Sequence, residues 1–299
     1  MRALVTGGAG FVGRHMAAAL VDRGYVVSTW DLADGADARA LFRSNITTPH
    51  DLVVHCAFHV GGRAAIDREP RLLARNLELD AAMFDWAVRT EQARVLYFSS
   101  SAAYPVDLQD DPASDRRLSE GDVFWGENVV GTPDARYGWA KLTGEHLARA
   151  AAESGLPVHV VRPFSGYGAD QSLDYPFPSF IDRARRGEDP MVIWGPGTQV
   201  RDWIHIDDVV AGALAVVDAD YRQPVNLCTG IGTSMLDLAY MCCRAAGNNT
   251  VTLAPQPDKP TGVANRVGDP TLFHRFYTPR VSLQEGVERA LAATGAITG

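Results

Sequence analysis

Arg2-Ala-Leu-Val-Thr6 and Gly7-Gly-Ala-Gly10-Phe-Val-Gly13 follow each other without a break and decide the fold of this chain. The first stretch is short, apolar and rich in strand formers. After the glycines, the spacing of apolar side chains in residues 14–23 predicts an amphipathic helix. A second predicted strand, residues 25–30, closes on Asp31. The order of strand, glycine turn, helix, strand and acidic residue predicts the first part of a doubly wound parallel sheet.

In this context the glycines are typical of a dinucleotide site. Gly7 permits the tight turn, Gly10 lets the backbone approach a pyrophosphate, and Gly13 lets the helix pack on the strand. The N-terminus of the helix offers N–H donors and a positive dipole to the phosphates. Asp31 stands where a carboxylate accepts hydrogen bonds from both adenosine ribose hydroxyls and repels a 2′-phosphate. We therefore expect NAD rather than NADP. The alternative to a dinucleotide site is that the glycines form a structural turn in another kind of α/β protein.

A second informative stretch is Tyr137-Gly-Trp-Ala-Lys141, because only two of the 28 basic residues of this chain are lysines. In a helix, residues i and i+4 share a face. An ammonium close to a phenol favours the phenolate and lowers the tyrosine pKa from its usual ~10 toward neutrality. The pair would then form a general base for a sugar or alcohol hydroxyl. A surface tyrosine beside a surface lysine would give the same spacing.

Composition excludes several classes of protein. The 299 residues can bury the core of one large or two modest domains. A net charge of −8 without a basic stripe argues against a nucleic-acid partner. No apolar run approaches the ~20 residues of a membrane helix, and we expect neither a signal peptide nor a membrane partner. The four cysteines show neither paired nor metal-ligand spacing, so we expect a reduced, cytoplasmic protein without a metal site.

Strand-like runs alternate with helical patterns through the first half of the chain. Strands are predicted at residues 51–56, 94–98 and 158–162, and helices at 70–90 and 137–154. This alternation predicts an α/β fold with a Rossmann-type doubly wound parallel sheet. Only 20 residues separate Asp31 from Asp51, and Asp34-Gly-Ala-Asp37 joins the second strand directly to the next helix. We therefore expect the third strand to be shortened or lost.

The regular alternation fades after residue 162. Residues 105–136 read as a long polar loop over the site. Helices are predicted at 176–186, 207–217, 234–246 and 282–293, and strands at 191–194 and 224–228. We assign residues 1–165, with about 203–227, to an NAD-binding domain. Residues 166–202 and 228–299 form the predicted smaller α/β substrate domain.

Taken together, the motifs resemble the extended short-chain dehydrogenase/reductase family, specifically the NAD-dependent epimerases and dehydratases that act on nucleotide sugars. The likeness covers nearly the whole chain. Besides the glycine turn and Tyr137-x-x-x-Lys141, it runs through Val54-His-Cys-Ala57, Ser99-Ser-Ser-Ala-Ala-Tyr-Pro105, Arg162-Pro-Phe-Ser-Gly-Tyr-Gly168, residues 197–208 and Arg266-Val-Gly-Asp269.

The resemblance implies a role for each matched residue. Tyr137 is the catalytic base, Lys141 holds the nicotinamide ribose, and Ser100 hydrogen-bonds the reacting hydroxyl, with Ser101 as the fallback. Arg201 and Arg266 clamp the nucleotide diphosphate of the substrate, since a guanidinium forks onto phosphate oxygens. The implied cofactor contacts are Gly7, Gly10, Phe11, Val12, Gly13, Asp31, Ala57, Asn76, Ser99, Tyr137, Lys141 and Pro163. The implied substrate contacts are Ser100, Ser101, Tyr137, Arg201 and Arg266.

Four further side chains invite a functional interpretation. His55 lies in a predicted strand and is expected to be a packed structural histidine, and His205 is expected to be structural as well. Trp194 and Trp203 can stack on a nucleotide base, but burial in the core is favoured for both. Relatives usually dimerise through the helices that are here residues 70–90 and 137–154, so a homodimer is expected.

The reaction depends on the residues near Ser100. In the resembled 4,6-dehydratases, an Asp-Glu pair occupies the positions of Ser101 and Ala102. The decarboxylating relatives carry a glutamate at the Ala102 position. The 3,5-epimerases carry a cysteine at that position. Because Ser101 and Ala102 provide none of these acidic or thiol groups, C4 epimerisation through a transient 4-keto sugar is favoured. Against this, Val60-Gly-Gly62 and Tyr104-Pro105 resemble the 3,5-epimerase branch. A dehydratase, an NADPH-dependent 4-ketosugar reductase and a non-catalytic nucleotide-binding regulatory protein remain as alternatives.

Overall fold

A computed structural model describes residues 1–44, 48–60, 69, 71–123 and 131–293, which divide into two compact units. Unit 1 comprises Met1–Ala103, Pro133–Pro163 and Val210–Val225. Unit 2 comprises Tyr104–Thr132, Phe164–Val209 and Asn226–Gly299.

Unit 1 is built on a six-stranded sheet in the order β2-β1-β3-β4-β5-β9. The strands are β1 (Arg2–Thr6), β2 (Val26–Trp30), β3 (Leu52–His55), β4 (Val95–Phe98), β5 (Val158–Pro163) and β9 (Val225–Leu227). The pairs from β2 to β5 are all parallel. Every residue of β3 and β4 is buried, as continuous apolar runs predict for central strands of a parallel sheet. The sheet order and the parallel strands confirm the predicted fold class.

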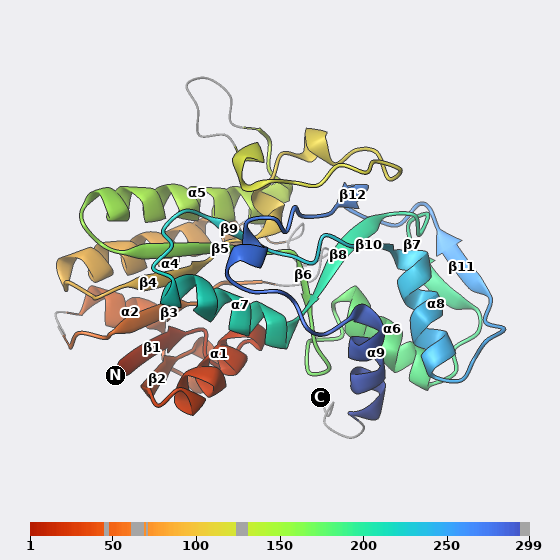
Figure 1. Ribbon diagram of the computed structural model, residues 1–299, viewed down its shortest axis with the longest axis horizontal. Helices are drawn as coiled ribbons and strands as arrows, with labels where there is room; N and C mark the ends of the chain where they lie inside the picture. The colour runs from red at the N-terminus through yellow and green to blue at the C-terminus, as the bar shows by residue number, and fades with distance from the viewer. Residues whose placement is uncertain (45–47, 61–68, 70, 124–130, 294–299) are drawn as a thin grey trace. The chain divides into compact units, whose positions relative to one another are not determined.

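Helices cover both faces of this sheet (Figure 1). On one face, α2 (Ala38–Arg43), α4 (Arg71–Arg89) and α5 (Ala135–Glu153) pack together. Their core includes Phe42, Met83, Trp86 and Ala148 against Val53 and Tyr97 of the strands. On the other face lie α1 (Phe11–Asp22) and α7 (Ile206–Asp218). The carboxyl ends of β1, β3 and β4 meet at one edge, since Thr6 pairs with His55 and His55 with Tyr97.

The sheet ends at β2. A single turn of 3-10 helix, Leu32–Asp34, and then α2 follow this strand. Among the described residues, no strand lies between β2 and β3, which confirms the expected loss of the third strand. Val26 of the edge strand is consequently exposed.

The part of unit 2 that the structure describes contains two small sheets and three helices. In the first sheet, β8 (Val200–His205) lies between β10 (Gly232–Ser234) and β12 (Asn265–Arg266) and also pairs with β6 (Ser165–Tyr167). The second sheet pairs β7 (Met191–Trp194) with β11 (Leu253–Gln256). The helices α6 (Pro176–Arg185), α8 (Met235–Ala245) and α9 (Leu283–Ala292) share a core that includes Tyr167, Phe177, Leu238 and both Cys242 and Cys243.

The unit boundaries differ from the expected domain boundaries in one segment. Residues 104–132 were assigned to the first domain, but they belong to unit 2. Backbone hydrogen bonds explain this, because Leu118 N–H donates to Val267 O and Asn265 N–H donates to Gln109 O. The segment that returns to unit 1 is residues 210–225, within the predicted range of about 203–227.

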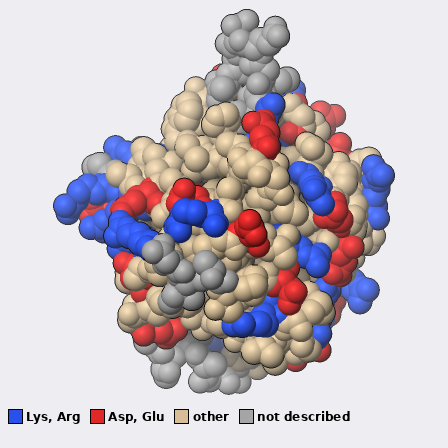
Figure 2. Space-filling view, turned by 90° about the vertical axis from the view of Figure 1, so that its left-hand side faces the viewer, with Lys and Arg blue, Asp and Glu red and all other residues tan. Residues whose placement is uncertain are grey.

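Two surface properties bear on partners. No helix among the described residues combines the length and the apolar character needed to cross a bilayer. On the face shown in Figure 2, positive and negative side chains are interspersed and form no continuous basic area.

Candidate active site

The glycine turn of unit 1 is packed so tightly that a Cβ on Gly7, Gly8 or Gly13 would collide with a neighbouring atom. Gly7 has φ of +72°, and a Cβ on it would lie 2.6 Å from the Ala57 nitrogen at the end of β3. A Cβ on Gly13 would lie 1.9 Å from the Gly7 carbonyl oxygen. The packing of α1 against the turn therefore requires Gly7 and Gly13.

Gly10 differs, because the protein's own packing constrains it less than the other glycines of the turn. It is the exposed N-cap of α1, and a Cβ there would meet only the Gly7 carbonyl oxygen, at 3.1 Å. The half-buried Phe11 and Val12 begin the helix. An open glycine at a helix N-terminus fits a pyrophosphate that needs close approach to the backbone.

Asp31 is held firmly at the end of β2. Its Oδ2 accepts a hydrogen bond from Ala9 N–H at 3.0 Å, and its Oδ1 accepts one from Ala33 N–H at 2.8 Å. The carboxylate thus sits against the glycine turn, where it fits the ribose diol of NAD and opposes a 2′-phosphate. The open Gly10 and the fixed Asp31 together make the residues of unit 1 a suitable cradle for NAD.

Tyr137 and Lys141 both lie on α5 and converge on one aromatic ring. The Phe58 ring packs edge-on against Tyr137, with centroids 5.5 Å apart and planes at 88°. Lys141 Nζ lies 3.5 Å from the centroid of the same ring and donates a hydrogen bond to Phe98 O at 2.8 Å. The side chains therefore point the same way, as their i, i+4 spacing predicts.

The Lys141 ammonium is buried, and burial lowers its pKa to about 8. The charge of Asp80 is the largest influence in the opposite direction. The face of the Phe58 ring also favours a cation at this short distance. Near neutral pH the lysine therefore remains mostly an ammonium, which is the form that stabilises a phenolate.

Ser100 reaches the same region because α5 docks against the turn that follows β4. Asp134 N–H, just before α5, donates to the carbonyl oxygen of Ala102 at 2.9 Å. A Cβ on Gly138 would lie 2.3 Å from that oxygen, so the glycine after Tyr137 permits the close approach. Ser100 is half-buried, and its Oγ accepts a hydrogen bond from Ala102 N–H at 3.1 Å. Ser101 is only 4% exposed, which makes Ser100 the accessible hydroxyl.

Sequence reasoning missed two residues of this arrangement, Gly138 and Phe58. Gly138 lies inside the Tyr137-x-x-x-Lys141 motif, where a glycine in a helix interior was a usable signal because it is unfavourable without a packing reason. Phe58 directly follows the predicted contact Ala57 but carries no sequence signal of its own.

Other predicted cofactor residues use their polar groups within the protein. Asn76 Oδ1 accepts His59 N–H at 2.8 Å, and its Nδ2 donates to His59 O at 3.1 Å, so Asn76 fastens the segment after β3. The Ser99 hydroxyl donates to Glu145. Ala57 N–H donates to Thr6 Oγ1 at 3.4 Å, and Pro163 is the half-buried last residue of β5. These residues shape the edge of the sheet at which Tyr137 and Lys141 lie.

In unit 2, the two predicted phosphate-binding arginines are neighbours. Arg201 of β8 pairs in register with Arg266 of the parallel strand β12. Arg201 donates to Val263 O at 2.8 Å, and Arg266 Nε donates to Gln109 Oε1 at 2.6 Å. Two adjacent guanidinium groups can both donate hydrogen bonds to the oxygens of one diphosphate. The pair therefore fits a diphosphate.

The two tryptophans differ. Trp203 is buried as expected, but the expectation is wrong for Trp194, which is 52% exposed at the end of β7. The Trp194 indole stays exposed because the chain turns at Gly195, directly after it, and leaves the ring at the rim of unit 2. Lys259 Nζ lies 5.9 Å from its ring centroid. An exposed indole is a flat surface that fits a nucleotide base.

The remaining polar residues of the 197–208 stretch and His55 are structural. Asp202 accepts backbone N–H groups of Thr229, Gly230 and Gly268. His205 packs edge-on against Tyr167, with centroids 5.3 Å apart. His55 lies buried between Thr6 and Asp80. Both histidines thus have structural partners within the protein.

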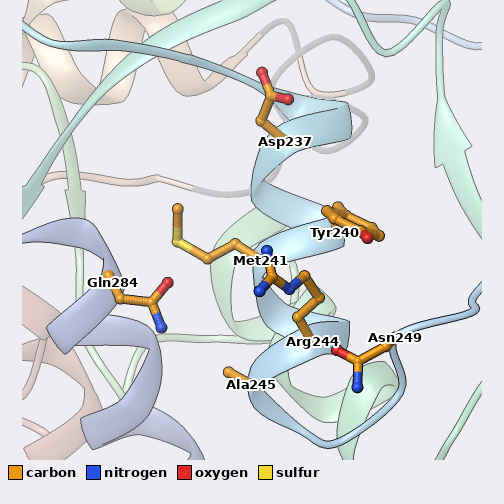
Figure 3. Close-up of a pocket in the computed structure, with 7 residues that line it drawn as sticks. All are labelled: Asp237, Tyr240, Met241, Arg244, Ala245, Asn249 and Gln284. Atoms are coloured by element: carbon orange, nitrogen blue, oxygen red, sulfur yellow. The ribbon is translucent and has the colours of Figure 1, made fainter.

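Unit 2 contains a hollow of about 360 Å³, and Figure 3 shows the residues that line it. It is lined by Asp237, Tyr240, Met241, Arg244, Ala245, Asn249 and Gln284. None of the predicted site residues lies in it. Of Val60-Gly-Gly62, residues 61 and 62 lie outside the described residues. In the described part of the chain, no group of three or more His, Cys, Asp or Glu side chains is placed to hold a metal ion.

The fold and this site define an NAD-dependent enzyme. The family model described as "NAD dependent epimerase/dehydratase family" matches residues 3–228, and the chain belongs to that family. The predicted family and the NAD cofactor are thereby confirmed.

Similar proteins share the architecture but differ in reaction. A UDP-N-acetyl-alpha-D-glucosaminuronate decarboxylase of Bacillus cytotoxicus is 27% identical over 97% of this chain and 96% of its own. A dTDP-4-dehydro-6-deoxy-D-allose reductase of a Streptomyces species is 28% identical over 89% of this chain and 87% of its own. The structure of MoeE5 in complex with UDP-glucose and NAD superposes with a TM-score of 0.79, is 26% identical and covers 98% of both chains.

Proposed function

We propose that this protein is a nucleotide-sugar 4-epimerase. The observation that carries the proposal is the convergence of Tyr137 and Lys141 on Phe58, next to a turn where Ser100 is followed by the buried Ser101 and Ala102. Inversion at C4 needs one base for one hydroxyl proton. Elimination or inversion at C3 and C5 needs a further acid or base near those carbons, and Ala102 supplies none.

In the proposed reaction, each residue of the catalytic group handles one atom. Tyr137 takes the proton of the C4 hydroxyl as the 4-keto sugar forms. The ketosugar then rotates, so that hydride returns to the other face of C4, and Tyr137 gives the proton back to the C4 oxygen. The Lys141 ammonium stabilises the phenolate form of Tyr137 and holds the nicotinamide ribose. The Ser100 hydroxyl donates a hydrogen bond to the C4 oxygen. NAD, when bound, supplies the acceptor for the hydride that leaves C4 and the source of the hydride that returns.

We assign the nucleotide part of the substrate to unit 2. Arg201 and Arg266 bind the diphosphate, and the adjacency of their strands supports this role. Trp194 offers its exposed ring to the base. UDP- and dTDP-sugars are the substrates named for similar proteins, so a nucleotide sugar of this kind is the first candidate.

A 4-ketosugar reductase is the second candidate, because a similar protein carries that name at 28% identity. A reductase releases its oxidised cofactor after each turnover, whereas an epimerase regenerates its cofactor and keeps it. The position of Asp31 favours NAD over NADPH. Identifying the nicotinamide that co-purifies with the protein separates the two: tightly held NAD supports the epimerase, and an empty protein that binds NADPH supports the reductase.

The direct experiment is to incubate the holoprotein with UDP-, dTDP- and GDP-sugars in turn and to analyse the products by NMR. We expect a C4-inverted sugar from one of them. Accumulation of a dehydrated ketosugar would move the assignment to a dehydratase. NAD binding with no conversion of any sugar would favour a non-catalytic, regulatory nucleotide-binding protein.

We also propose that two copies pair through α4 and α5. The two helices pack against each other in unit 1, and Trp139 on α5 remains 43% exposed. A large exposed indole on a helix is a typical anchor of a protein–protein interface. A second copy would cover it in a four-helix arrangement.

A further inference from the structure

Four buried polar side chains of unit 1, on the strands and helix near Lys141, are linked by hydrogen bonds. Thr6 Oγ1 is 2.7 Å from His55 Nδ1, and His55 Nε2 is 3.1 Å from Asp80 Oδ1. The other oxygen, Asp80 Oδ2, accepts a hydrogen bond from the Tyr97 hydroxyl at 2.6 Å. Asp80 is completely buried. Because a buried carboxylate is unfavourable unless a charge or several donors compensate it, its presence here needs a physical reason.

The buried charges of unit 1 form two complementary sets. Among its described residues, the buried Asp, Glu, Lys and Arg side chains are Asp80, Lys141, Glu145 and Arg162. Glu145 and Arg162 neutralise each other in a two-pronged ion pair, with Nε–Oε1 at 2.8 Å and Nη2–Oε2 at 2.7 Å. Asp80 and Lys141 are the remaining carboxylate and cation of these four side chains, and His55 Nε2 also lies 3.1 Å from Asp80 Oδ1.

Asp80 faces the part of α5 that carries Lys141. A Cβ on Gly144 would lie 2.7 Å from Asp80 Oδ2 and 1.8 Å from the Tyr97 hydroxyl oxygen. Gly144 follows Lys141 by three residues, and such residues share a helix face. Lys141 Nζ also lies 5.2 Å from the centroid of the Tyr97 ring. The ring that donates to Asp80 is therefore a neighbour of the ammonium.

The other ionisable groups near Lys141 do not supply a free negative charge at neutral pH. These groups are Cys56 after β3, Tyr97 on β4, and Tyr137 and Glu145 on α5. Burial raises the pKa of the Cys56 thiol to about 12, and burial together with Asp80 raises the pKa of Tyr97 well above its ordinary value. Glu145 is neutralised by Arg162.

We propose that Asp80 is a positioning residue for the Tyr137–Lys141 pair, because its buried carboxylate is the counter-charge that keeps the Lys141 side chain an ammonium. The inference rests on the proposed function, in which Lys141 acts beside Tyr137. Since the pKa of Lys141 is already about 8, removal of this charge converts the lysine to a neutral amine within the working pH range.

The chain offers an unusually clean measurement, because Lys141 and Lys259 are its only lysines. Carbon-13 labelling of lysine in the NAD-bound protein gives two side-chain signals, and Lys259→Arg assigns them. We expect the Lys141 signal to titrate with a midpoint near 8 in the unaltered protein. In Asp80→Asn the midpoint falls by ~1 unit or more, while the Lys259 signal stays in place. An unchanged Lys141 midpoint in Asp80→Asn would overturn the proposal.

Two variants control for packing. Asp208→Asn alters a similar buried carboxylate, which accepts from the Tyr277 hydroxyl at 2.7 Å within unit 2, and should leave the Lys141 midpoint unchanged. Tyr97→Phe removes a donor to Asp80 but keeps the charge, so the midpoint should not fall. A fall of equal size in either control would assign the effect to packing and reject the role of Asp80. If Asp80→Asn does not fold, the titration of Lys141 in the unaltered protein provides the test. A Lys141 midpoint of ~6, which is typical of buried lysines without a counter-charge, would overturn the proposal.

Activity provides an independent reading. Turnover declines as pH rises through the Lys141 pKa, because the ammonium is lost. In Asp80→Asn this alkaline limb should move down by the same shift as the lysine signal. If the signal moves but the unaltered protein converts no nucleotide sugar, the proposed function fails and the role of Asp80 stands. If sugars are converted through Tyr137 but the lysine signal does not move in Asp80→Asn, the role of Asp80 is rejected and the proposed function stands.

Discussion

At the scale of single residues, the account depends on the two side chains that converge on Phe58. Tyr137 and Lys141 are four residues apart on α5, and the ring of Phe58 contacts both. This arrangement fixes the direction of the phenol and places a cation beside it. Burial of Lys141 sharpens the effect, since a charge in a low-dielectric environment acts more strongly on its neighbour.

Substitution of Tyr137 by phenylalanine tests this arrangement. We expect Tyr137→Phe to lower turnover by ~10²–10⁴-fold, because general-base catalysis contributes about that much. NAD binding should remain, since the ring and its contact with Phe58 are kept. The measurement is turnover of the active nucleotide sugar, with cofactor content determined in parallel. Tyr240→Phe, in the hollow of unit 2, is the control and should keep full activity. Turnover of Tyr137→Phe at the unaltered rate would remove Tyr137 from the mechanism.

At the scale of elements, the packing of the protein constrains the glycines of the turn to different degrees. A Cβ on Gly13 would collide with the Gly7 carbonyl oxygen at 1.9 Å, whereas one on Gly10 would approach the same atom only to 3.1 Å. Similar substitutions at these positions should therefore have different effects.

We predict that Gly13→Ala destabilises the fold by about 1–3 kcal/mol, as overpacking usually does. Gly10→Ala should change stability much less but weaken NAD binding, since the added methyl group stands at the N-terminus of α1. Thermal unfolding without cofactor measures the first effect, and titration with NAD measures the second. Equal NAD affinity in Gly10→Ala and the unaltered protein would contradict the assigned position of the pyrophosphate.

The adjacent strands β8 and β12 carry the second element-scale prediction. Arg266→Gln should weaken binding of UDP or dTDP by about 10–100-fold, because a charge-assisted hydrogen bond to phosphate contributes about 1.5–3 kcal/mol. NAD affinity should not change. Calorimetric titration with the free nucleotides measures both, and Arg244→Gln on α8 serves as the control. If Arg266→Gln and the control bind the nucleotide equally well, the phosphate role of Arg266 is incorrect.

At the scale of the whole molecule, the proposed dimer rests on the surface exposure of α5. Trp139 is 43% exposed on a helix that is otherwise well packed against α4. We expect a dimer in solution and predict that Trp139→Glu shifts it to monomers that still bind NAD. Light scattering at several concentrations measures the mass. Thr143→Glu, half-buried one turn further along α5, tests whether the same face is involved. A monomeric unaltered protein would exclude this interface.

Much of the fold could be predicted from the sequence, because long amphipathic helices and central parallel strands leave strong periodic patterns. The predicted helix at residues 70–90 became Arg71–Arg89, and the strand at 94–98 became Val95–Phe98. The strands β6, β8, β10, β11 and β12 were missed. Three of them, β6, β10 and β12, have only two or three residues, which carry no period. The attachment of residues 104–132 to unit 2 was missed because it rests on backbone hydrogen bonds such as Leu118 to Val267.

For the candidate site, the sequence indicated the residues that form local motifs but not those that meet only in the fold. Tyr137, Lys141 and the glycines lie in recognisable spacings. Phe58 and Asp80 come from other elements and contribute through burial and charge, which a single sequence does not display. The exposure of Trp194 likewise depends on where the turn after β7 ends the strand.

The most direct test of the central claim is to run the reaction in D2O with the holoprotein and an active nucleotide sugar, and to locate deuterium in the product by NMR. The proposed chemistry removes the hydrogen from C4 and returns the same one, so the C4-inverted product should carry no deuterium on its ring carbons. Deuterium at C3 or C5, or a 6-deoxy-4-keto product deuterated at C6, would contradict 4-epimerisation.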